Sequence, residues 1–355
     1  MTPAKQLAYA AKLFGKILAL KVVRLILLAL VLAIMLPTVF FYIVRPKPAA
    51  QINYGINFSQ KYASELGLDW KKSYLQILDD LKPKYARLVV YWDISEPQVT
   101  KYNYTDILWQ LDEAKRRNVK VILTMGRKVL RYPECHEPEW WKQSKDPIVK
   151  ESTLLKYIEN TTNQLKGYEN IAMWQVENEP MFPFGDCQKQ TKETVEKEIA
   201  VVRRLDDRPI LVQDSGEGGF WRPIYLMGDY LGISMYRRTW FNFWKEAVGT
   251  SFYVEYPLAH WTYKIKSVLT GVPADKIIVT ELQGEPWGPA INSNLTEEEK
   301  QKTMSKQQFL ETISYAQQSG FKDIYFWGPE WWLWEKEVNN NPFFWEAAKA
   351  VIQNN

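Results

Sequence analysis

Two glutamates occupy comparable places in the sequence, each at the end of a short apolar run. Glu179 closes the segment WQVENEP, and Glu281 directly follows Ile278–Thr280. Hydrolysis of a glycosidic bond uses two carboxyl groups, one that protonates the departing oxygen and one that attacks the sugar or activates water. Glu285 is the alternative to Glu281, but Glu281 adjoins the apolar run, where a scaffold can fix its position. The pair therefore predicts a glycosidase site, provided that the fold brings the two residues together.

The elements that would position this pair follow a regular alternation. Eight short apolar runs typical of buried strands alternate with stretches such as 107–117 and 307–318, whose apolar residues recur at helical spacing. Strands buried on both faces and separated by helices indicate a parallel α/β fold. The eight runs are Asn53–Asn57, Arg87–Trp92, Lys120–Met125, Ile171–Val176, Pro209–Gln213, Leu231–Tyr236, Lys276–Thr280 and Asp323–Trp327.

Eight repeats over about 300 residues favour a closed (β/α)₈ barrel (TIM barrel) over an open sheet. No linker rich in Gly, Pro or Ser divides residues 51–355, so we expect a single domain there. In such barrels the site is built at the C-terminal ends of the strands. Glu179 and Glu281, after the fourth and seventh runs, would then face each other across the mouth.

At these positions the chain resembles glycoside hydrolase clan A, the group that includes the family 5 cellulases and mannanases. In that clan an Asn-Glu pair, often followed by Pro, closes the fourth strand and supplies the acid/base, and a Glu closing the seventh strand is the nucleophile. Asn178, Glu179 and Glu281 match those positions. The resemblance implies a retaining, double-displacement mechanism in which Asn178 binds the 2-hydroxyl of the sugar.

The resemblance extends to the substrate-binding positions of the clan. It implies that Arg87 in the second run and Tyr236 at the end of the sixth contact the nucleophile, and that Trp327 at the end of the eighth forms a floor for the sugar. Trp92 and Trp240, just beyond strand ends, are weaker candidates for sugar contacts. The alternatives are a structural ion pair for Arg87 and core packing for the tryptophans.

The chain also departs from family 5 in two places. Family 5 enzymes usually have a His near the end of the third strand and another before the Tyr of the sixth. Those places read Thr124–Gly126 and Ser234–Met235 here. The departures point away from family 5 and its cellulose-type substrates, but not from the clan.

Composition argues against several other functions. Seven of the 45 basic residues precede Pro48 with no acidic residue among them, so the remainder carries 38 basic against 41 acidic residues and gives no argument for nucleic-acid binding. With only two histidines, a His-rich zinc or iron centre is not expected. The sequence lacks a G-x-S-x-G elbow. We expect neither a metal nor an organic cofactor.

The N-terminal segment predicts a membrane anchor. Residues 25–44 are apolar and uncharged, which suffices to cross a hydrocarbon core of roughly 30 Å as a helix. Five of the seven basic residues lie in 1–24 and two in the short linker 45–50, so the positive-inside rule places the N-terminus in the cytoplasm and the domain outside. A cleaved signal peptide is the alternative, although the apolar stretch is long for one.

The two cysteines, Cys135 and Cys187, follow the third and fourth strand runs and so belong to adjacent loops on one face of the barrel. In an extracytoplasmic domain such a pair favours a disulfide over a metal site.

Taken together, these features predict a membrane-anchored retaining glycoside hydrolase that acts on a poly- or oligosaccharide. Three alternatives stay open. A transglycosylase would use the same site with a sugar acceptor in place of water. A non-catalytic carbohydrate-binding or cell-envelope protein could use the same barrel. A membrane-anchored scaffold protein could use its aromatic loops to contact lipid or protein, because fold alone does not fix function.

Overall fold

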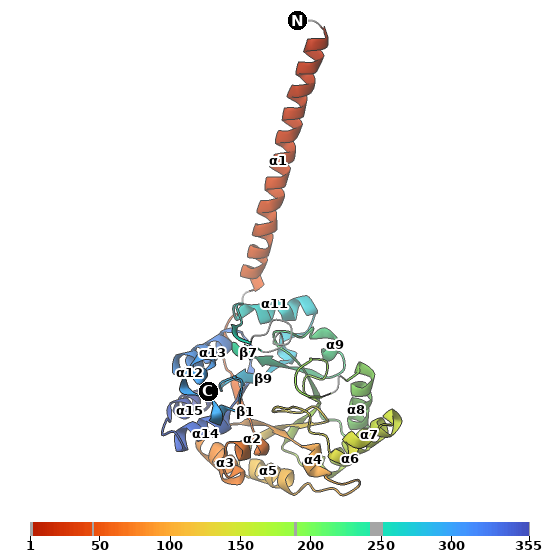
Figure 1. Cartoon of the computed structure of the whole chain (residues 1–355), viewed down its shortest axis with the longest axis vertical. Helices are drawn as coiled ribbons and strands as arrows, with labels where there is room; N and C mark the ends of the chain where they lie inside the picture. Colours follow the sequence, from red (N-terminus) through yellow and green to blue (C-terminus); the bar gives the residue numbers. More distant parts are fainter. Residues whose placement is uncertain (1–2, 45, 188–189, 242–250, 355) are drawn as a thin grey trace. The chain divides into compact units, whose positions relative to one another are not determined.

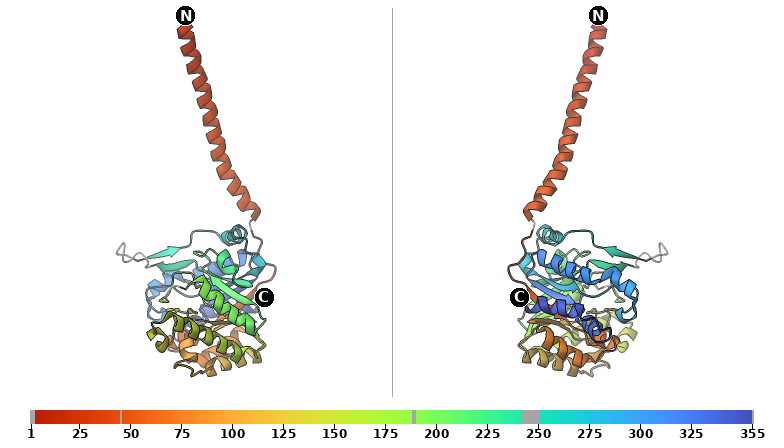
Figure 2. Two further views of the ribbon diagram at one scale, coloured as in Figure 1. Left: turned by 90° about the vertical axis from the view of Figure 1, so that its right-hand side faces the viewer. Right: turned by 90° about the vertical axis from the view of Figure 1, so that its left-hand side faces the viewer.

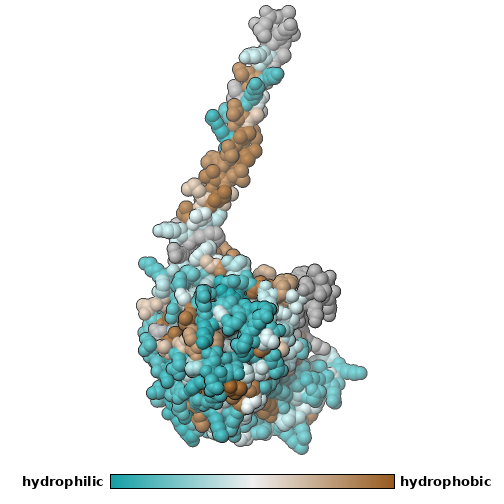
Figure 3. Space-filling model, turned by 60° about the vertical axis from the view of Figure 1, so that its left-hand side comes forward, coloured by the Kyte–Doolittle hydropathy of each residue, from teal (hydrophilic) through white to brown (hydrophobic). Residues whose placement is uncertain are grey.

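The computed structural model describes residues 3–44, 46–187, 190–241 and 251–354. The chain divides into two compact units, Met1–Pro46 and Lys47–Asn355. The first unit is a single helix, α1 (Pro3–Val44), which continues through Pro37. Its stretch Ala19–Phe40 has a mean hydropathy of 2.6 and is long and apolar enough to cross a membrane. Figure 3 shows this stretch in brown, with hydrophilic teal side chains toward the N-terminal end of the helix.

The second unit is a closed barrel of eight parallel strands, as the sequence predicts (Figure 1). Around the barrel the order is β1-β10-β9-β6-β5-β4-β3-β2, so neighbours in sequence are neighbours in space apart from one inserted hairpin. Four strands coincide with their predicted runs: β1 (Asn53–Asn57), β3 (Lys120–Met125), β4 (Ile171–Val176) and β10 (Asp323–Trp327). The other four are β2 (Tyr85–Val89), β5 (Ile210–Asp214), β6 (Tyr230–Met235) and β9 (Ile277–Gln283).

Helices surround the strands on the outside of the barrel (Figure 2). Local signals define several of their ends: Asp146 caps α7 with Pro147 in its first turn, and Ser305 and Gln308 form a capping box on α13. The helices of the described chain are α2 (Gln60–Glu65), α3 (Trp70–Gln76), α4 (Trp92–Ser95), α5 (Thr105–Arg116), α6 (Glu139–Gln143), α7 (Pro147–Leu165), α8 (Lys192–Leu205), α9 (Arg222–Tyr225), α11 (Trp261–Thr270), α12 (Glu297–Thr303), α13 (Lys306–Gln318), α14 (Pro329–Glu337) and α15 (Phe343–Gln353). Short turns of other helix types are η1 (Ile77–Leu81), η2 (Ala274–Lys276) and η3 (Asn292–Asn294).

Two strand boundaries and one inserted hairpin bear on the candidate site. β2 begins at Tyr85, which pairs with Gly55 and Lys120, and the apolar run continues past the strand, so that Trp92 begins α4. β9 extends through Gln283, which places Glu281 inside the strand and not after it. The aromatic-rich interval between β6 and α11 contains an antiparallel pair, β7 (Arg238–Phe241) and β8 (Phe252–Glu255), and residues 242–250 between them lie outside the described residues.

The barrel interior has an apolar layer and, nearer the C-terminal ends of the strands, a polar layer. We call these the lower and the upper layer. The lower layer is a separate cluster that includes Ile122, Leu211, Ile278 and Tyr325. Gly55 belongs to this layer, because a Cβ there would lie 2.6 Å from the ring of Tyr325. Side chains at positions i and i+2 of a strand point to the same face. The residues two positions beyond the lower layer therefore also point into the barrel, at its mouth.

Candidate active site

Glu281 lies in β9 at the mouth of the barrel and is surrounded by hydrogen-bond donors. Arg87 Nη1 and Gln213 Nε2 donate to Oε1 at 2.9 Å and 2.7 Å, and the Tyr236 hydroxyl donates to Oε2 at 3.2 Å. The carboxyl group is buried, with 4% of the residue exposed. A cation and two neutral donors stabilise the charged form of a carboxylate. The predicted contacts of Arg87 and Tyr236 with Glu281 are confirmed.

Arg87 is the centre of this arrangement and is completely buried. Burial lowers the pKa of Arg87 from its ordinary value, and the adjacent Glu281 carboxylate opposes that effect. The guanidinium also donates to four side-chain oxygens, at distances between 2.5 and 3.1 Å, which satisfies a cation that would otherwise be costly to bury. The acceptors are on Asn57, Gln175, Asn178 and Gln213.

Three of those acceptors were missed from the sequence. Asn57, Gln175 and Gln213 each stand at or next to the end of a mostly apolar strand, in β1, β4 and β5. All three are buried. A polar side chain at this place in a buried strand is the signal that would have identified them, because buried polar groups require partners.

Glu179 has a different environment. It follows β4 in a left-handed conformation (φ 44°), and its Oε1 accepts a hydrogen bond of 2.9 Å from Ser234 Oγ. Burial raises the pKa of Glu179 well above its ordinary value, and the nearby negative charges of Glu281 and Glu134 raise it further. Lys128 and the bond from Ser234 only partly offset this. Ser234 occupies one of the places where a family 5 enzyme usually has His.

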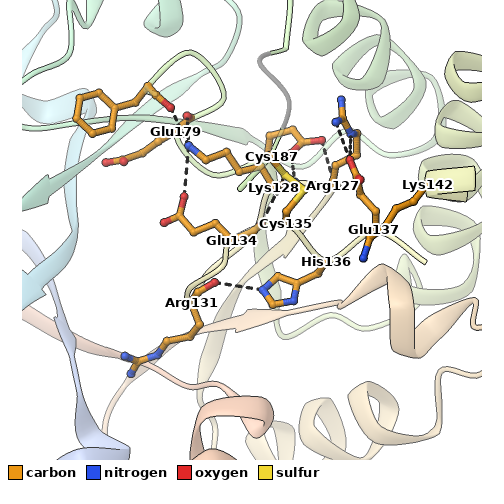
Figure 4. Close-up of a disulfide and its surroundings, with 12 residues drawn as sticks. Arg127, Lys128, Arg131, Glu134, Cys135, His136, Glu137, Lys142, Glu179 and Cys187 are labelled. Carbon is orange, nitrogen blue, oxygen red and sulfur yellow. Dashed lines mark hydrogen bonds and ion pairs between the residues drawn. A yellow bond between two sulfur atoms is a disulfide. The ribbon is translucent and has the colours of Figure 1, made fainter. Parts of the chain in front are cut away.

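The segment after β3 supports the backbone at Glu179 (Figure 4). Lys128 Nζ donates to the carbonyl oxygens of Glu179 (2.8 Å) and Phe182 (2.9 Å). The carboxylate of Glu177 accepts the backbone N–H groups of Arg127 and Lys128 at 2.8 Å and 2.6 Å. A Cβ at Gly126 would lie 2.5 Å from the Glu177 carboxyl carbon, so a side chain there would displace it. The Glu177 carboxylate is therefore engaged in stabilising the segment after β3, so we do not assign it the acid/base role.

Cys135 and Cys187 form the predicted disulfide between the segments that follow β3 and β4. With Glu137 these sulfurs make a cluster of potential metal ligands. The sulfurs are bonded to each other, and Glu137 accepts a hydrogen bond of 2.7 Å from Arg127 Nε. The cluster is thus a covalent and ionic brace, not a set of free ligands.

Trp327 closes β10 and is held at the mouth by charged neighbours. Its Nε1 donates to Glu285 Oε1 at 2.9 Å, and the Arg131 guanidinium lies 4.2 Å from its ring centroid. Arg131 also pairs with Glu285 and with Glu330, all of them buried. Glu285 therefore belongs to a buried ion cluster that supports Trp327, which removes it as the alternative to Glu281.

The other two tryptophan candidates lie elsewhere. Trp92 has no exposed surface and stacks on Tyr157 at a centroid distance of 4.7 Å within the main core. It packs the core, so we no longer include it among the candidate sugar contacts. Trp240 is partly exposed in β7, opposite Tyr253 of the hairpin, and it remains a candidate contact.

No protein-family profile matches the chain, and no curated protein sequence matches it. Solved structures do. An exo-β-1,4-mannosidase from Opitutaceae bacterium strain TAV5 aligns with a TM-score of 0.57 and 16% identity over 87% of this chain and 62% of its own. Xylanase 10B from Thermotoga petrophila RKU-1, solved with xylobiose, aligns with a TM-score of 0.52 and 16% identity over 78% of this chain and 82% of its own.

A GH5_18 protein from Streptomyces cattleya, solved with GlcNAc, gives a TM-score of 0.53 at 13% identity over 79% of this chain and 71% of its own. This chain spans less than two thirds of the mannosidase. Identities this low show a shared fold alone. That fold is the closed (β/α)₈ barrel, which the sequence also predicts.

Proposed function

We propose that this protein is a retaining glycoside hydrolase in which Glu281 is the nucleophile and Glu179 the acid/base. The observation that carries the proposal is the contrast between the two carboxyl groups. Both are buried. Glu281 accepts from Arg87, Gln213 and Tyr236, whereas Glu179 has one hydroxyl donor and a raised pKa. Two carboxyl groups whose surroundings drive their protonation apart are the requirement for acid and nucleophile roles.

The roles follow from these environments. Glu281 attacks the anomeric carbon while Glu179 transfers its proton to the departing oxygen, which gives a covalent glycosyl-enzyme. Formation of that ester removes the charge of Glu281, which is one of the causes that raise the pKa of Glu179. Glu179 then becomes a better base for the water that releases the sugar. A retaining pair requires carboxyl groups about 5–5.5 Å apart, and we expect that separation here.

The proposal is tested by measuring hydrolysis of a panel of glycans by the full chain in detergent. The neighbours' names include a mannosidase, a β-galactosidase and proteins solved with xylobiose or Manβ1-4GlcNAc, so the glycan panel begins with β-linked mannosides, galactosides and xylosides. We expect cleavage of at least one glycan, and a loss of about 10⁴-fold or more in Glu281→Gln with sugar binding retained. Glu169→Gln, an exposed carboxyl, is the matched control. A wild-type protein that cleaves no glycan, or an active Glu281→Gln, contradicts the proposal.

We also propose that α1 anchors the barrel at the outer side of a membrane. The uncharged stretch in Ala19–Phe40 and the excess of basic residues before it support this orientation. External protease should degrade the barrel in intact spheroplasts, and detergent should be required to extract the full chain. Protection of the barrel until the membrane is broken would reverse the orientation, and release of the barrel by washing would indicate a cleaved leader.

A further inference from the structure

A third carboxyl group, that of Glu134, lies in the candidate active site and has no role in the mechanism above. It is buried, with 6% of the residue exposed. Its Oε1 lies 3.4 Å from Asn178 Nδ2, and its Oε2 lies 3.3 Å from Lys128 Nζ. Burial raises the pKa of Glu134 to about 8, Lys128 opposes this effect, and the charge of Glu281 adds to it.

The backbone holds Glu134 firmly in this position. Its φ is 62°, a left-handed conformation that is uncommon for a residue with a side chain and that clusters at functional sites. Its N–H donates to Arg131 O at 2.6 Å, and its carbonyl accepts from Val129 N at 2.9 Å. The next residue, Cys135, is bonded to Cys187 on the segment that follows Glu179 (Figure 4). The disulfide thus joins the segment that carries Glu134 to the one that carries the proposed acid/base.

Neither carboxylate oxygen of Glu134 is well satisfied within the protein. A distance of 3.4 Å to Asn178 is long for a hydrogen bond, whose usual value is about 2.9–3.0 Å. Oε2 has the Lys128 ammonium at 3.3 Å as its partner, although the geometry is not that of a hydrogen bond. Buried polar groups are almost always paired in native proteins. A ligand atom within reach of Oε1 would supply the short hydrogen bond that this oxygen lacks.

The position of Asn178 indicates which ligand atom that is. Its Oδ1 accepts from Arg87 Nη2 at 2.6 Å, so its Nδ2 is the free end of the amide and lies beside Glu134. In the proposed mechanism Nδ2 donates to the 2-hydroxyl of the sugar. A hydroxyl oxygen about 2.9 Å from both Nδ2 and Glu134 Oε1 closes a triangle whose third side is the observed 3.4 Å. One hydroxyl can therefore accept from Asn178 and share a proton with Glu134.

We propose that Glu134 is a substrate-recognition residue that binds the polar, hydrogen-bonding substituent at C2 of the sugar attacked by Glu281. This inference rests on the proposed glycosidase function and extends it to a substrate class: glycosides with a free hydroxyl group at C2. Hydrogen bonding to such a group would satisfy Glu134 only when substrate is bound. An analogue that lacks the group would leave Oε1 of the buried carboxyl without a short hydrogen bond, which disfavours binding.

The test compares kcat/KM for two probes, using the full chain in detergent. One is the 4-nitrophenyl glycoside that the wild type cleaves fastest among the β-D-mannoside, β-D-glucoside and β-D-galactoside, and the other is its 2-deoxy analogue. We expect Glu134→Ala and Glu134→Gln to lose about 10- to 100-fold on the 2-hydroxyl probe. On the 2-deoxy probe they should differ from wild type by less than about threefold, because the contact is already absent. Glu139→Gln, exposed on α6, is the control and should match wild type on both.

The outcomes separate this inference from the function on which it rests. An equal loss on both probes would mean that Glu134 only supports Lys128 and the loop, and it would overturn the inference while leaving the glycosidase intact. Unchanged activity in Glu134→Gln on both probes would overturn it too. If Glu134→Ala fails to fold, the near-isosteric Glu134→Gln decides the question. A wild type that cleaves no glycoside at all contradicts the proposed function, and the inference falls with it.

Discussion

The two proposed catalytic carboxyl groups are supported in different ways. Glu281 is held from within the barrel, where Arg87 and Gln213 on β2 and β5 reach it directly. Glu179 is held largely from outside the strands, by a segment that includes Lys128 and Glu134 and is tied down by a disulfide. We call these the strand side and the loop side of the site. The strand side stabilises a charge, and the loop side keeps a proton.

The difference follows from what each role demands. A nucleophile needs a fixed charge, and strands in a closed barrel place donors around it with little freedom. An acid that must later act as a base needs a pKa that changes with the charge of the other carboxyl group. Burial with few hydrogen-bond donors makes the pKa sensitive to that charge. Only Ser234 donates to the Glu179 carboxyl among the described side-chain contacts, while Glu281 receives three donors.

The largest effect expected on the loop side comes from removing the acid. Glu179→Ala should lower kcat/KM by about 10²–10⁴-fold on substrates with poor leaving groups, and far less on aryl glycosides that depart without a proton. Azide should restore turnover as a glycosyl azide with the anomeric configuration of the substrate, because the strand side is intact and the covalent intermediate still forms. An equal loss on good and poor leaving groups would show that Glu179 is not the acid.

Breaking the strand side should affect stability as well as activity. Arg87→Leu leaves Glu281 and four amide oxygens without their buried cation, which should lower the free energy of unfolding by about 3–5 kcal/mol. The matched control is Arg204→Leu, whose ion pair with Glu159 lies at the surface, and about 0–1 kcal/mol is expected there. Denaturant titrations of both variants check this, and equal losses would contradict a special role for the Arg87 cluster.

Opening the disulfide should loosen the loop side alone. The bond closes a loop of 52 residues, so Cys135→Ser with Cys187→Ser should cost about 2–4 kcal/mol of unfolding free energy. Activity should fall more for poor than for good leaving groups, because Glu179 and not Glu281 loses support. Thermal melts together with the two substrate types measure this. A uniform fall in rate would contradict the separation into two sides.

The smallest expected effect is a shift of the pH profile. The hydrogen bond from Ser234 lowers the pKa of Glu179, so Ser234→Ala should raise it further. Glu179 must be protonated for the first step, and activity is lost as pH rises through its pKa. The basic limb of kcat/KM should therefore move to higher pH, by up to about one unit. An unmoved limb, or one that moves to lower pH, would mean that another group sets it.

Sequence reasoning reached the strand side better than the loop side. Glu281 could be identified because strand ends in a barrel converge on one mouth, whatever the loops do. The resemblance to clan A implied Arg87 and Tyr236, which lie in or next to strands and contact Glu281. Glu134 and Lys128 could not be identified, since their approach to Glu179 depends on a loop with left-handed residues and a disulfide. The spacing of residues along the chain does not indicate the conformation of this loop.

Trp92 was predicted as a site residue but lies in the core, whereas Glu134 and Lys128 were missed. It follows an apolar run and was expected at the mouth, but β2 ends at Val89 and the chain turns into α4, which buries the ring against Tyr157. Strand boundaries set by pairing with neighbours cannot be read from apolarity alone. The same reasoning explains why β9 runs past Glu281.

The central claim is that Glu281 forms a covalent bond to the sugar. A 2-deoxy-2-fluoro glycoside with a good leaving group slows release of that intermediate, so that peptide mapping by mass spectrometry can locate the adduct. We predict one sugar per protein, on the peptide that contains Glu281, and no adduct in Glu281→Gln. An adduct on Glu179 or Glu285, or turnover of a cleaved glycoside to a product of inverted configuration without any adduct, would contradict the account.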